Sequence, residues 1–226
     1  MNAITLIIIA SLVSLSLSAT HLDNAIDLVK RLNKSTNNTY GTNPNWIDWI
    51  KPAARTECNS FLNRLHQYTY GTNESYFKSW MNSTSPTAAK WHDAIEAGNR
   101  FLKKVNVSTI LEGDFMAIKY PPGLSSTGHA MLVCGKPTVR TATAPLVSST
   151  TQYSVDVCDS SASYHGKNDT RLSQTSPQGI GRGTFRLYAN VTTKQIVGYT
   201  WSLDTGSVYY TQGERHLAVG TLRTRS

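Results

Sequence analysis

Cysteine is scarce in this sequence. Three of its 226 residues are cysteine, which is an odd number. A small secreted domain held together by disulfide bonds has a larger and even number, so the sequence excludes that class of protein. At most one bridge can form, which leaves at least one free thiol. Because a free thiol in an oxidising compartment is a liability unless it is used or deeply buried, we expect one cysteine to take part in chemistry.

Long apolar runs are also missing. The run at residues 4–17 is too short, and too often interrupted by serine, for a membrane span. Small residues at positions 16 and 18 end it, as before a signal cleavage site. We therefore expect residues 1–18 to be a secretory signal peptide. Residues 19–226 are expected to form a single domain that is secreted (extracellular or periplasmic) and has no stable membrane anchor.

Negative charge is sparse: acidic residues number 14 and basic residues 22, so the formal net charge is +8. A basic secreted protein favours anionic partners such as cell-wall polymers, although the charge could equally serve solubility alone. No Arg-rich helix and no basic run interleaved with aromatics occurs, so we expect no nucleic acid partner. The six histidines lack the spacing of metal ligands, and the glycines at 179–183 lack phosphate-loop spacing. We therefore expect no metal and no cofactor.

Hydrophobic periodicity changes near residue 108. Before it, apolar residues recur at helical spacing, and after it they form short runs typical of strands. With no internal repeat and no linker, the sequence predicts one α+β domain in which N-terminal helices precede a mostly antiparallel sheet. The predicted helices are residues 21–32, 55–65, 76–80 and 85–104, with a helical turn at 46–50; the predicted strands are residues 115–120, 128–134, 153–158, 184–190, 196–203 and 217–222.

Three residues suited to thiol catalysis stand at the ends of predicted elements. Cys58 lies in the first turn of a predicted helix, where unpaired N–H groups and the helix dipole stabilise a thiolate. His129 opens a predicted buried strand, and Asp159 follows the next one. A cysteine nucleophile needs a base, usually histidine, and the histidine needs an acceptor on its other ring nitrogen. The order predicts Cys58 as nucleophile, His129 as base and Asp159 as orienting residue.

Antiparallel pairing of the strands at 129–134 and 153–158 would bring the last two residues together. Consecutive strands often pair in this way, which would place the backbones of His129 and Asp159 about 5 Å apart. In that register Cys134 and Cys158 are several residues apart, too far for a disulfide bond. We therefore expect both cysteines to be buried core residues; a bridge between them is the alternative in a different register.

Three stretches around these residues form a recognisable set: residues 56–61 (Thr-Glu-Cys-Asn-Ser-Phe), 112–118 (Glu-Gly-Asp-Phe-Met-Ala-Ile) and 127–133 (Thr-Gly-His-Ala-Met-Leu-Val). They resemble the landmarks of NlpC/P60-type cysteine peptidases, and the resemblance covers residues 55–160. It implies a papain-like fold and hydrolysis of amide bonds in peptidoglycan stem peptides. Cys58, His129 and Asp159 would then have the roles given above.

The segment after Asp159 is long, polar and irregular. Within it, His165 could bind substrate or take the role of Asp159, and Arg182 could pair with a substrate carboxylate. The predicted function is that of a secreted, monomeric cysteine peptidase acting on peptidoglycan or a related peptide. Two alternatives stay open. One is a transglutaminase-like acyl transferase, which has the same residue order; the other is a non-enzymatic basic module that binds cell-wall or glycan polymers, with Cys58 buried.

Overall fold

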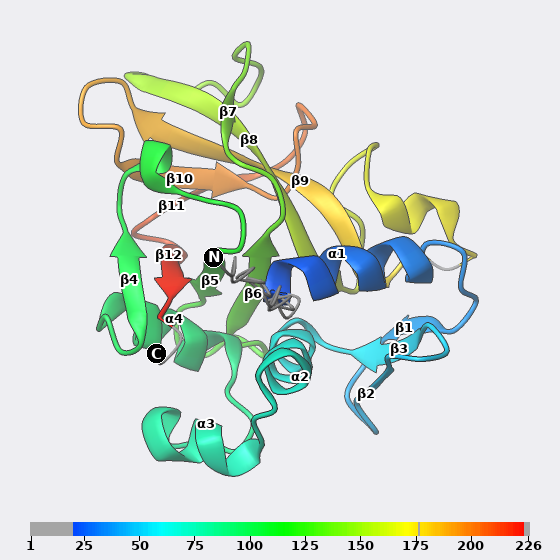
Figure 1. The fold of residues 1–226 in the computed structure, drawn as a ribbon. Helices are drawn as coiled ribbons and strands as arrows, with labels where there is room; N and C mark the ends of the chain where they lie inside the picture. Colours follow the sequence, from blue (N-terminus) through cyan, green and yellow to red (C-terminus); the bar gives the residue numbers. More distant parts are fainter. Residues whose placement is uncertain (1–19, 176, 224–226) are drawn as a thin grey trace, which may run out of the picture.

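The computed structural model describes residues 20–175 and 177–223 of the chain. The signal peptide expected at residues 1–18 lies outside this part. Within it, no helix combines the length and the apolar character that crossing a membrane requires. The described residues form an α+β fold in which the α-helices precede a large antiparallel sheet (Figure 1). The predicted fold class is confirmed at this level.

Three of the helices begin at side-chain caps. Thr20, Asn73 and Thr87 each accept a hydrogen bond from the backbone N–H three residues on, which satisfies one of the free donors of a first turn. Gly71 ends a further helix in the left-handed conformation, with φ 61°. The helices of the described part are α1 (His21–Leu32), α2 (Cys58–Tyr70), α3 (Glu74–Met81) and α4 (Ala88–Glu96).

The large sheet has nine strands, and every pairing in it is antiparallel. Its order is β11-β10-β9-β8-β6-β5-β12-β4, with β7 paired to β8. β12, the last described strand along the chain, therefore lies between β5 and β4. The strands are β4 (Phe101–Lys104), β5 (Phe115–Lys119), β6 (Gly128–Val133), β7 (Thr138–Val139), β8 (Thr150–Ser161), β9 (Gly179–Asn190), β10 (Ile196–Thr200), β11 (Tyr209–Thr211) and β12 (His216–Leu222).

A smaller, three-stranded sheet leads into α2. It contains β1 (Asn38–Tyr40), β2 (Trp46–Asp48) and, between them, β3 (Ala53–Thr56). The helical turn predicted at residues 46–50 is wrong, because β2 pairs antiparallel with β3. The Asp48 carboxylate accepts from the backbone N–H groups of Ile50 and Lys51 and closes the turn between these strands. A single residue separates β3 from α2, so this sheet fixes where the helix begins.

The helix predicted at residues 85–104 ends earlier than expected. α4 stops at Glu96, the chain turns through Gly98 with φ 64°, and residues 101–104 form β4. Phe101 is buried as the helical spacing predicts, but it reaches the core from a strand paired with Leu222 of β12. The spacing of a few apolar residues fits either conformation, and here pairing with a distant strand decides the outcome.

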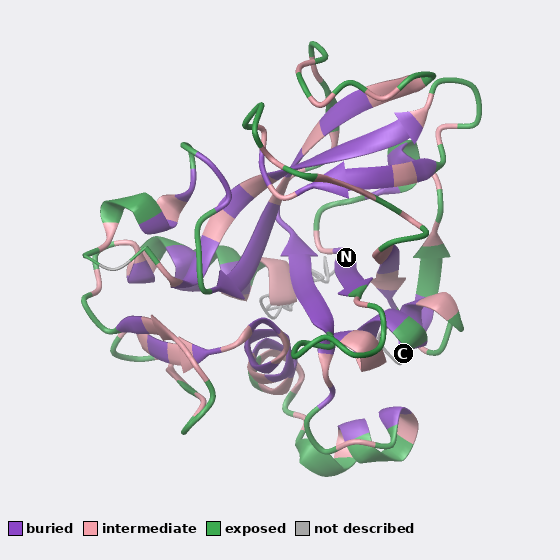
Figure 2. Ribbon diagram, turned by 180° about the vertical axis from the view of Figure 1, so that it is seen from behind, coloured by how far each residue is buried: buried purple, intermediate pink, exposed green. Residues whose placement is uncertain are grey.

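Two cores lie on the opposite faces of the large sheet. On one face α1, α2 and α4 pack against side chains such as Phe115, Ala117 and Leu132. On the other face, alternate residues of the same strands, including Met116 and Met131, pack with residues of β8, β9 and β10. This is the two-residue period of a strand. The central strands are consequently buried on both sides (Figure 2).

The Gly113-Asp114 step fastens the β5–β6 hairpin to β12. Gly113 has a φ of 87°, and its N–H donates to the Val133 carbonyl, while the Asp114 carbonyl accepts from the Val133 N–H. The fully buried Asp114 carboxylate accepts from the Leu111 N–H and from the Thr221 hydroxyl of β12. The Gly113-Asp114 step therefore has a structural role, and it lies at the end of the hairpin that is far from His129.

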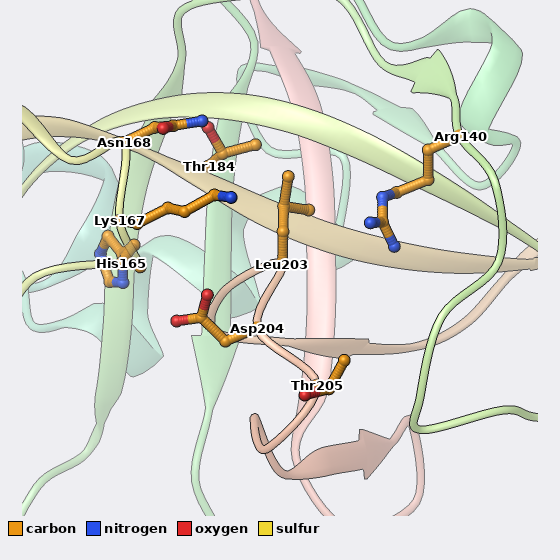
Figure 3. A pocket seen from close by; sticks show the side chains of 9 residues that line it. Arg140, His165, Lys167, Asn168, Thr184, Leu203, Asp204 and Thr205 are labelled. Carbon is orange, nitrogen blue, oxygen red and sulfur yellow. The ribbon is translucent and has the colours of Figure 1, made fainter.

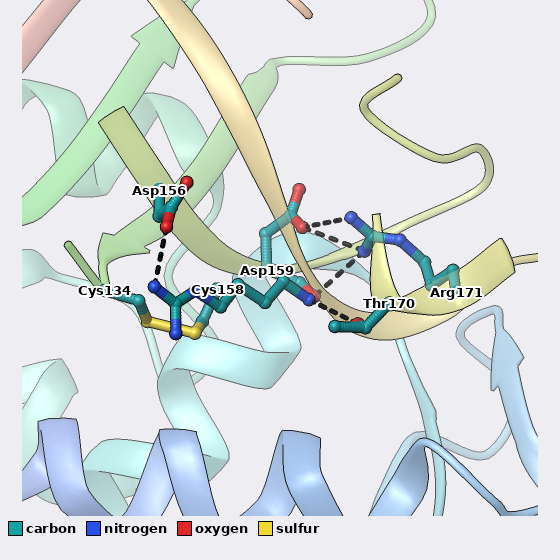
Figure 4. The surroundings of a disulfide bond; sticks show 7 residues. Cys134, Asp156, Cys158, Asp159, Thr170 and Arg171 are labelled. Atoms are coloured by element: carbon teal, nitrogen blue, oxygen red, sulfur yellow. Dashed lines mark hydrogen bonds and ion pairs between the residues drawn. A yellow bond between two sulfur atoms is a disulfide. The ribbon is translucent and has the colours of Figure 1, made fainter. Parts of the chain in front are cut away.

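Cys134 and Cys158 form a disulfide bond, so the expectation that both are unpaired core residues is wrong (Figure 4). The reason is the strand register. β6 and β8 pair Leu132 with Cys158, which is a shift from the register expected from the sequence. Cys134 consequently lies diagonally across from Cys158, with 5.8 Å between the Cα atoms, a distance that a bridge spans.

Candidate active site

Cys58 is the first residue of α2. The N–H of Glu57, the residue before the helix, donates to Ser60 Oγ at 2.8 Å and fixes the first turn. The free N–H groups of this turn and the helix dipole favour negative charge on the Cys58 sulfur. Cys58 is 5% exposed and is the free cysteine of the chain, because the other two are bridged.

His129 is the second residue of β6 and points its ring at a carboxylate. Its Nε2 lies 2.6 Å from Asp159 Oδ2, and the residue is 8% exposed. The preceding Gly128 has a φ of 143°, and a Cβ there would lie 1.9 Å from the Ile118 carbonyl oxygen. Only glycine therefore allows the close approach of β5 and β6 that holds His129 in place.

The charge state of His129 follows from its neighbours. Burial acts to lower the pKa of His129, but the nearby Cys58, hydrogen bonds to Asp159 and Cys58, and the Asp159 charge together raise it to about 10. His129 is therefore an imidazolium at neutral pH. With one ring N–H on Asp159 and the ring beside Cys58, it can balance a thiolate on one side and a carboxylate on the other.

Asp159, in β8, is fully buried and accepts from three side chains. Its Oδ2 accepts from His129 and, at 2.8 Å, from His165 Nε2. Its Oδ1 accepts from both terminal nitrogens of Arg171, at 2.8 and 2.9 Å. Burial acts to raise the pKa of Asp159, but Arg171, His165 and the hydrogen bond from His129 hold it well below its usual range. The carboxylate is therefore ionised when His129 is protonated.

Arg171 is a fully buried cation that the sequence analysis did not single out. It lies in the 3₁₀ turn Thr170–Ser173, and it also donates to both carboxylate oxygens of Asp169, at 3.0 and 2.9 Å. Asp169 in turn accepts from the backbone N–H of His165 at 2.7 Å. Arg171 thus ties the irregular segment to β8 and holds His165 beside Asp159. Burial of an arginine between two carboxylates has no local sequence signal, because the partners converge only in the fold.

Two aromatic groups cover the cluster. The Trp201 ring stacks on His165, with 6.1 Å between centroids and 13° between planes, and meets His129 edge-on at 5.3 Å. Burial and the nearby Cys58 raise the pKa of Tyr40, which lies beside Thr56 in the β1–β3 pairing. These rings limit the access of water to the charged groups, which strengthens the interactions among them.

A polar pocket of about 480 Å³ adjoins the cluster at His165 (Figure 3). Lys167 and Arg140 bring positive charge to its wall, and Asp204 brings negative charge. His165 is the member of the cluster that lines it. The prediction that His165 takes the role of Asp159 does not fit this geometry, because Asp159 itself accepts from His129 and His165 only meets the same carboxylate oxygen. Its place on the pocket wall is compatible with the other predicted role, substrate binding.

Arg182 is the predicted site residue that the structure does not bring into the cluster. In β9 it pairs with Cys158, so it faces away from Asp159, and its guanidinium lies 2.6 Å from Asp156 Oδ2. The alternation of side chains along β8 separates the two carboxylates, since Asp156 and Asp159 are three positions apart. Arg182 thus belongs to a partly exposed ion pair next to the disulfide.

Two groups of the described residues could hold a metal ion. One is His129, Asp159 and His165, and the other is His92, Glu96 and His216. In the first group, Asp159 Oδ2 already accepts from both histidines. The spacing of the histidines along the chain predicted no metal site. Neither group is apparent in the sequence, because each takes at least one ligand from an element far away in the chain.

Comparison with known proteins gives one informative match. No protein-family model matches the chain, and no solved structure matches it. The chain is 33% identical over 177 residues to "Uncharacterized protein R653" of Acanthamoeba polyphaga mimivirus, and the matched region covers 74% of this chain and 77% of that protein. On this similarity, which extends over most of both proteins, the chain belongs to the same family as the mimivirus protein R653.

Proposed function

We propose that this protein is a secreted, papain-like cysteine hydrolase that cleaves amide bonds in peptidoglycan stem peptides. The observation that carries the proposal is the place of His129, whose Nε2 lies 2.6 Å from a buried carboxylate and whose pKa is raised by the nearby Cys58 at a helix start. A thiol, a protonated imidazole and an orienting carboxylate are the groups that thiol hydrolysis requires. A helix with cysteine at its start, packed on an antiparallel sheet, supports the resemblance to NlpC/P60-type peptidases.

In the first half of the reaction, the Cys58 thiolate attacks the carbonyl carbon of the scissile amide. A carbon–sulfur bond forms, and the carbonyl oxygen becomes an oxyanion to which the Cys58 N–H can donate. The carbon–nitrogen bond then breaks as His129 gives its proton to the leaving nitrogen. The products of this half are a free amine and a thioester on Cys58, with His129 neutral and still held by Asp159.

The second half restores the enzyme. Neutral His129 takes a proton from water, and the resulting hydroxide attacks the thioester carbon. The carbon–sulfur bond breaks, a carboxylic acid leaves, and the thiolate and imidazolium form again. Because Asp159 is kept ionised by Arg171, it favours the protonated form of His129 at both ends of the cycle.

The setting agrees with action outside the cell. The Cys134–Cys158 bridge is typical of oxidising compartments, and the net charge of +8 suits an anionic cell-wall polymer. A free thiol that persists beside such a bridge favours a chemical role for Cys58.

The first experiment measures the rate at which iodoacetamide alkylates Cys58 in the folded protein across pH. The label reports one site, since Cys58 is the free cysteine. We expect fast alkylation that persists at pH 6 and is lost in His129→Ala but retained in His21→Gln, a histidine outside the cluster. Slow alkylation that does not depend on His129 would contradict the proposed pair and favour the binding-module alternative.

The second experiment measures cleavage of peptidoglycan fragments with and without an added amine. We expect new amino and carboxyl ends with the native chain and none with Cys58→Ala, whose folding circular dichroism checks. Incorporation of the amine in place of hydrolysis would identify an acyl transferase instead. Equal cleavage by Cys58→Ala would refute the thiol mechanism.

A further inference from the structure

A second group of ligand-type side chains lies where α4 meets β12. His92 and Glu96 are four residues apart on α4, one helical turn, and His216 is the first residue of β12. His92 Nε2 lies 2.8 Å from His216 Nδ1, and the ligand atoms of all three residues lie within 4.8 Å of one another. Two imidazoles and a carboxylate that converge in this way match the ligands of zinc sites.

The neighbouring Asp93 prepares His92 as a ligand. His92 Nδ1 lies 2.9 Å from Asp93 Oδ1, and a carboxylate only accepts, so the proton of His92 sits on Nδ1. The lone pair of the neutral ring is then on Nε2, which faces His216. Lys119 Nζ donates to both carboxylate oxygens of Asp93 at 2.8 Å and so fixes the orientation of that carboxylate toward His92. A carboxylate behind a histidine is the usual second layer of a metal site.

Glu96 supplies an unpartnered oxygen. Its Oε2 accepts from Lys103, whereas its Oε1 is shielded from solvent and has no hydrogen-bond partner. A buried carboxylate oxygen without a donor is costly, and a cation removes that cost. This atom is the independent sign that the group is built for a ligand.

We propose that His92, Glu96 and His216 bind a divalent transition-metal ion of the Zn²⁺ class. Imidazole and carboxylate together favour such an ion over Mg²⁺ or Ca²⁺, which prefer oxygen alone. Two nitrogens on a tetrahedral zinc lie about 3.3 Å apart, so the pair at 2.8 Å must open slightly. His216 is only partly buried and can supply that movement. Its Nδ1 proton moves to Nε2, which leaves a lone pair for the ion.

The ion would have an open side. Glu96 and His216 border a pocket of about 210 Å³ that is also lined by Lys103 and Gln212. Water in this pocket completes the four-coordinate shell. The site lies on the helical side of the sheet, since His216 pairs with Lys119 while the next residues of β12 and β5, Leu217 and Ile118, face the other core. The ion therefore clamps α4 to β12, and its three ligands are all separate from Cys58, His129 and Asp159.

The test measures zinc bound per chain after equilibrium dialysis, together with the absorption of bound Co²⁺. The starting protein is the full chain carrying Cys58→Ala, which removes the thiol as a competing ligand. We expect one zinc per chain and the intense visible bands of four-coordinate cobalt. Glu96→Gln and His216→Gln should each weaken zinc binding by at least about tenfold, and Asp93→Asn by about 10- to 100-fold.

Two matched variants locate the ion. Glu112→Gln changes an exposed glutamate elsewhere, and His165→Gln changes the other three-residue group; both should leave zinc binding intact. Loss of zinc in His165→Gln but not in Glu96→Gln would place the ion at the catalytic cluster and overturn the proposal. Failure of the starting protein to retain zinc would overturn it as well. Glu96 and His216 are partly exposed, so their variants are expected to fold, and circular dichroism checks this.

Discussion

Removal of Arg171 tests how the buried charges are balanced. Arg171→Met keeps an unbranched chain in the same space and removes the guanidinium. The change leaves the carboxylates of Asp159 and Asp169, 0% and 4% exposed, without their shared cation. Breaking a buried ion pair in this way costs about 3–5 kcal/mol. For a protein of this size the melting temperature should fall by about 6–20 °C, as measured by circular dichroism at pH 7.

The same variant changes the response to acid. The low pKa of Asp159 in the native protein means that its stabilising effect is present above the ordinary carboxyl range and is lost as pH falls through the folded value. Without Arg171 the pKa of Asp159 rises toward or above its unfolded value, so this stabilisation is already missing at pH 7 and little of it is left to lose in acid. Melting curves recorded from pH 7 down to pH 3 should therefore bring the native protein closer to the variant at the acid end.

Arg182→Met is the matched control. It removes the same side chain from the pair with Asp156, whose side chains are 41% and 36% exposed. Such a pair contributes about 0–1 kcal/mol, so the melting temperature should fall by no more than about 4 °C. If the two variants lost equal stability, the conclusion that Arg171 neutralises buried carboxylates would be refuted.

The disulfide and the protonated histidine lend themselves to similar tests. Replacing Cys134 and Cys158 by alanine should cost about 3.5 kcal/mol in urea unfolding, from the loop entropy of a bridge with a separation of 24 residues; an unchanged urea midpoint would contradict this. Because the pKa of His129 is raised from 6.5 to about 10, its proton stabilises the fold fully below pH 6.5, and this effect is lost as pH rises through about 10. Native stability should therefore fall more steeply between these pH values than that of His129→Gln, and parallel curves would count against an imidazolium in the folded protein.

The elements of the candidate site could be predicted from the sequence because their signals are local. The apolar spacing after Cys58 indicates a helix, and the run after His129 indicates a buried strand. The strand begins at residue 128 as expected, whereas the helix begins at Cys58 and not at residue 55, because residues 53–56 form β3. The approach of His129 to Asp159 followed from the tendency of consecutive strands to pair. These inferences depend only on the type and order of the elements along the chain. They do not depend on the exact register of the strands.

The remaining features depend on contacts between distant residues. The β6–β8 register is set by packing and strand twist, so the sequence could not show that Cys134 meets Cys158 diagonally. The segment that carries His165 and Arg171 has no periodicity, and its path depends on the ion pairs that Arg171 makes inside the fold. In the same way, the sequence of residues 101–104 fits the end of a helix, and only the pairing with β12 makes this segment the strand β4.

The place of β12 in the large sheet bears on when the site can form during synthesis. β5 ends at Lys119 and β4 at Lys104, yet the strand that pairs with both begins at His216. Until that strand leaves the ribosome, one side of the hairpin that carries His129 is an open edge, and contacts this distant along the chain form slowly. A growing chain therefore holds Cys58 and His129 without the sheet that aligns them. The proposed thiol site can therefore be completed only after the last strand of the large sheet has been made.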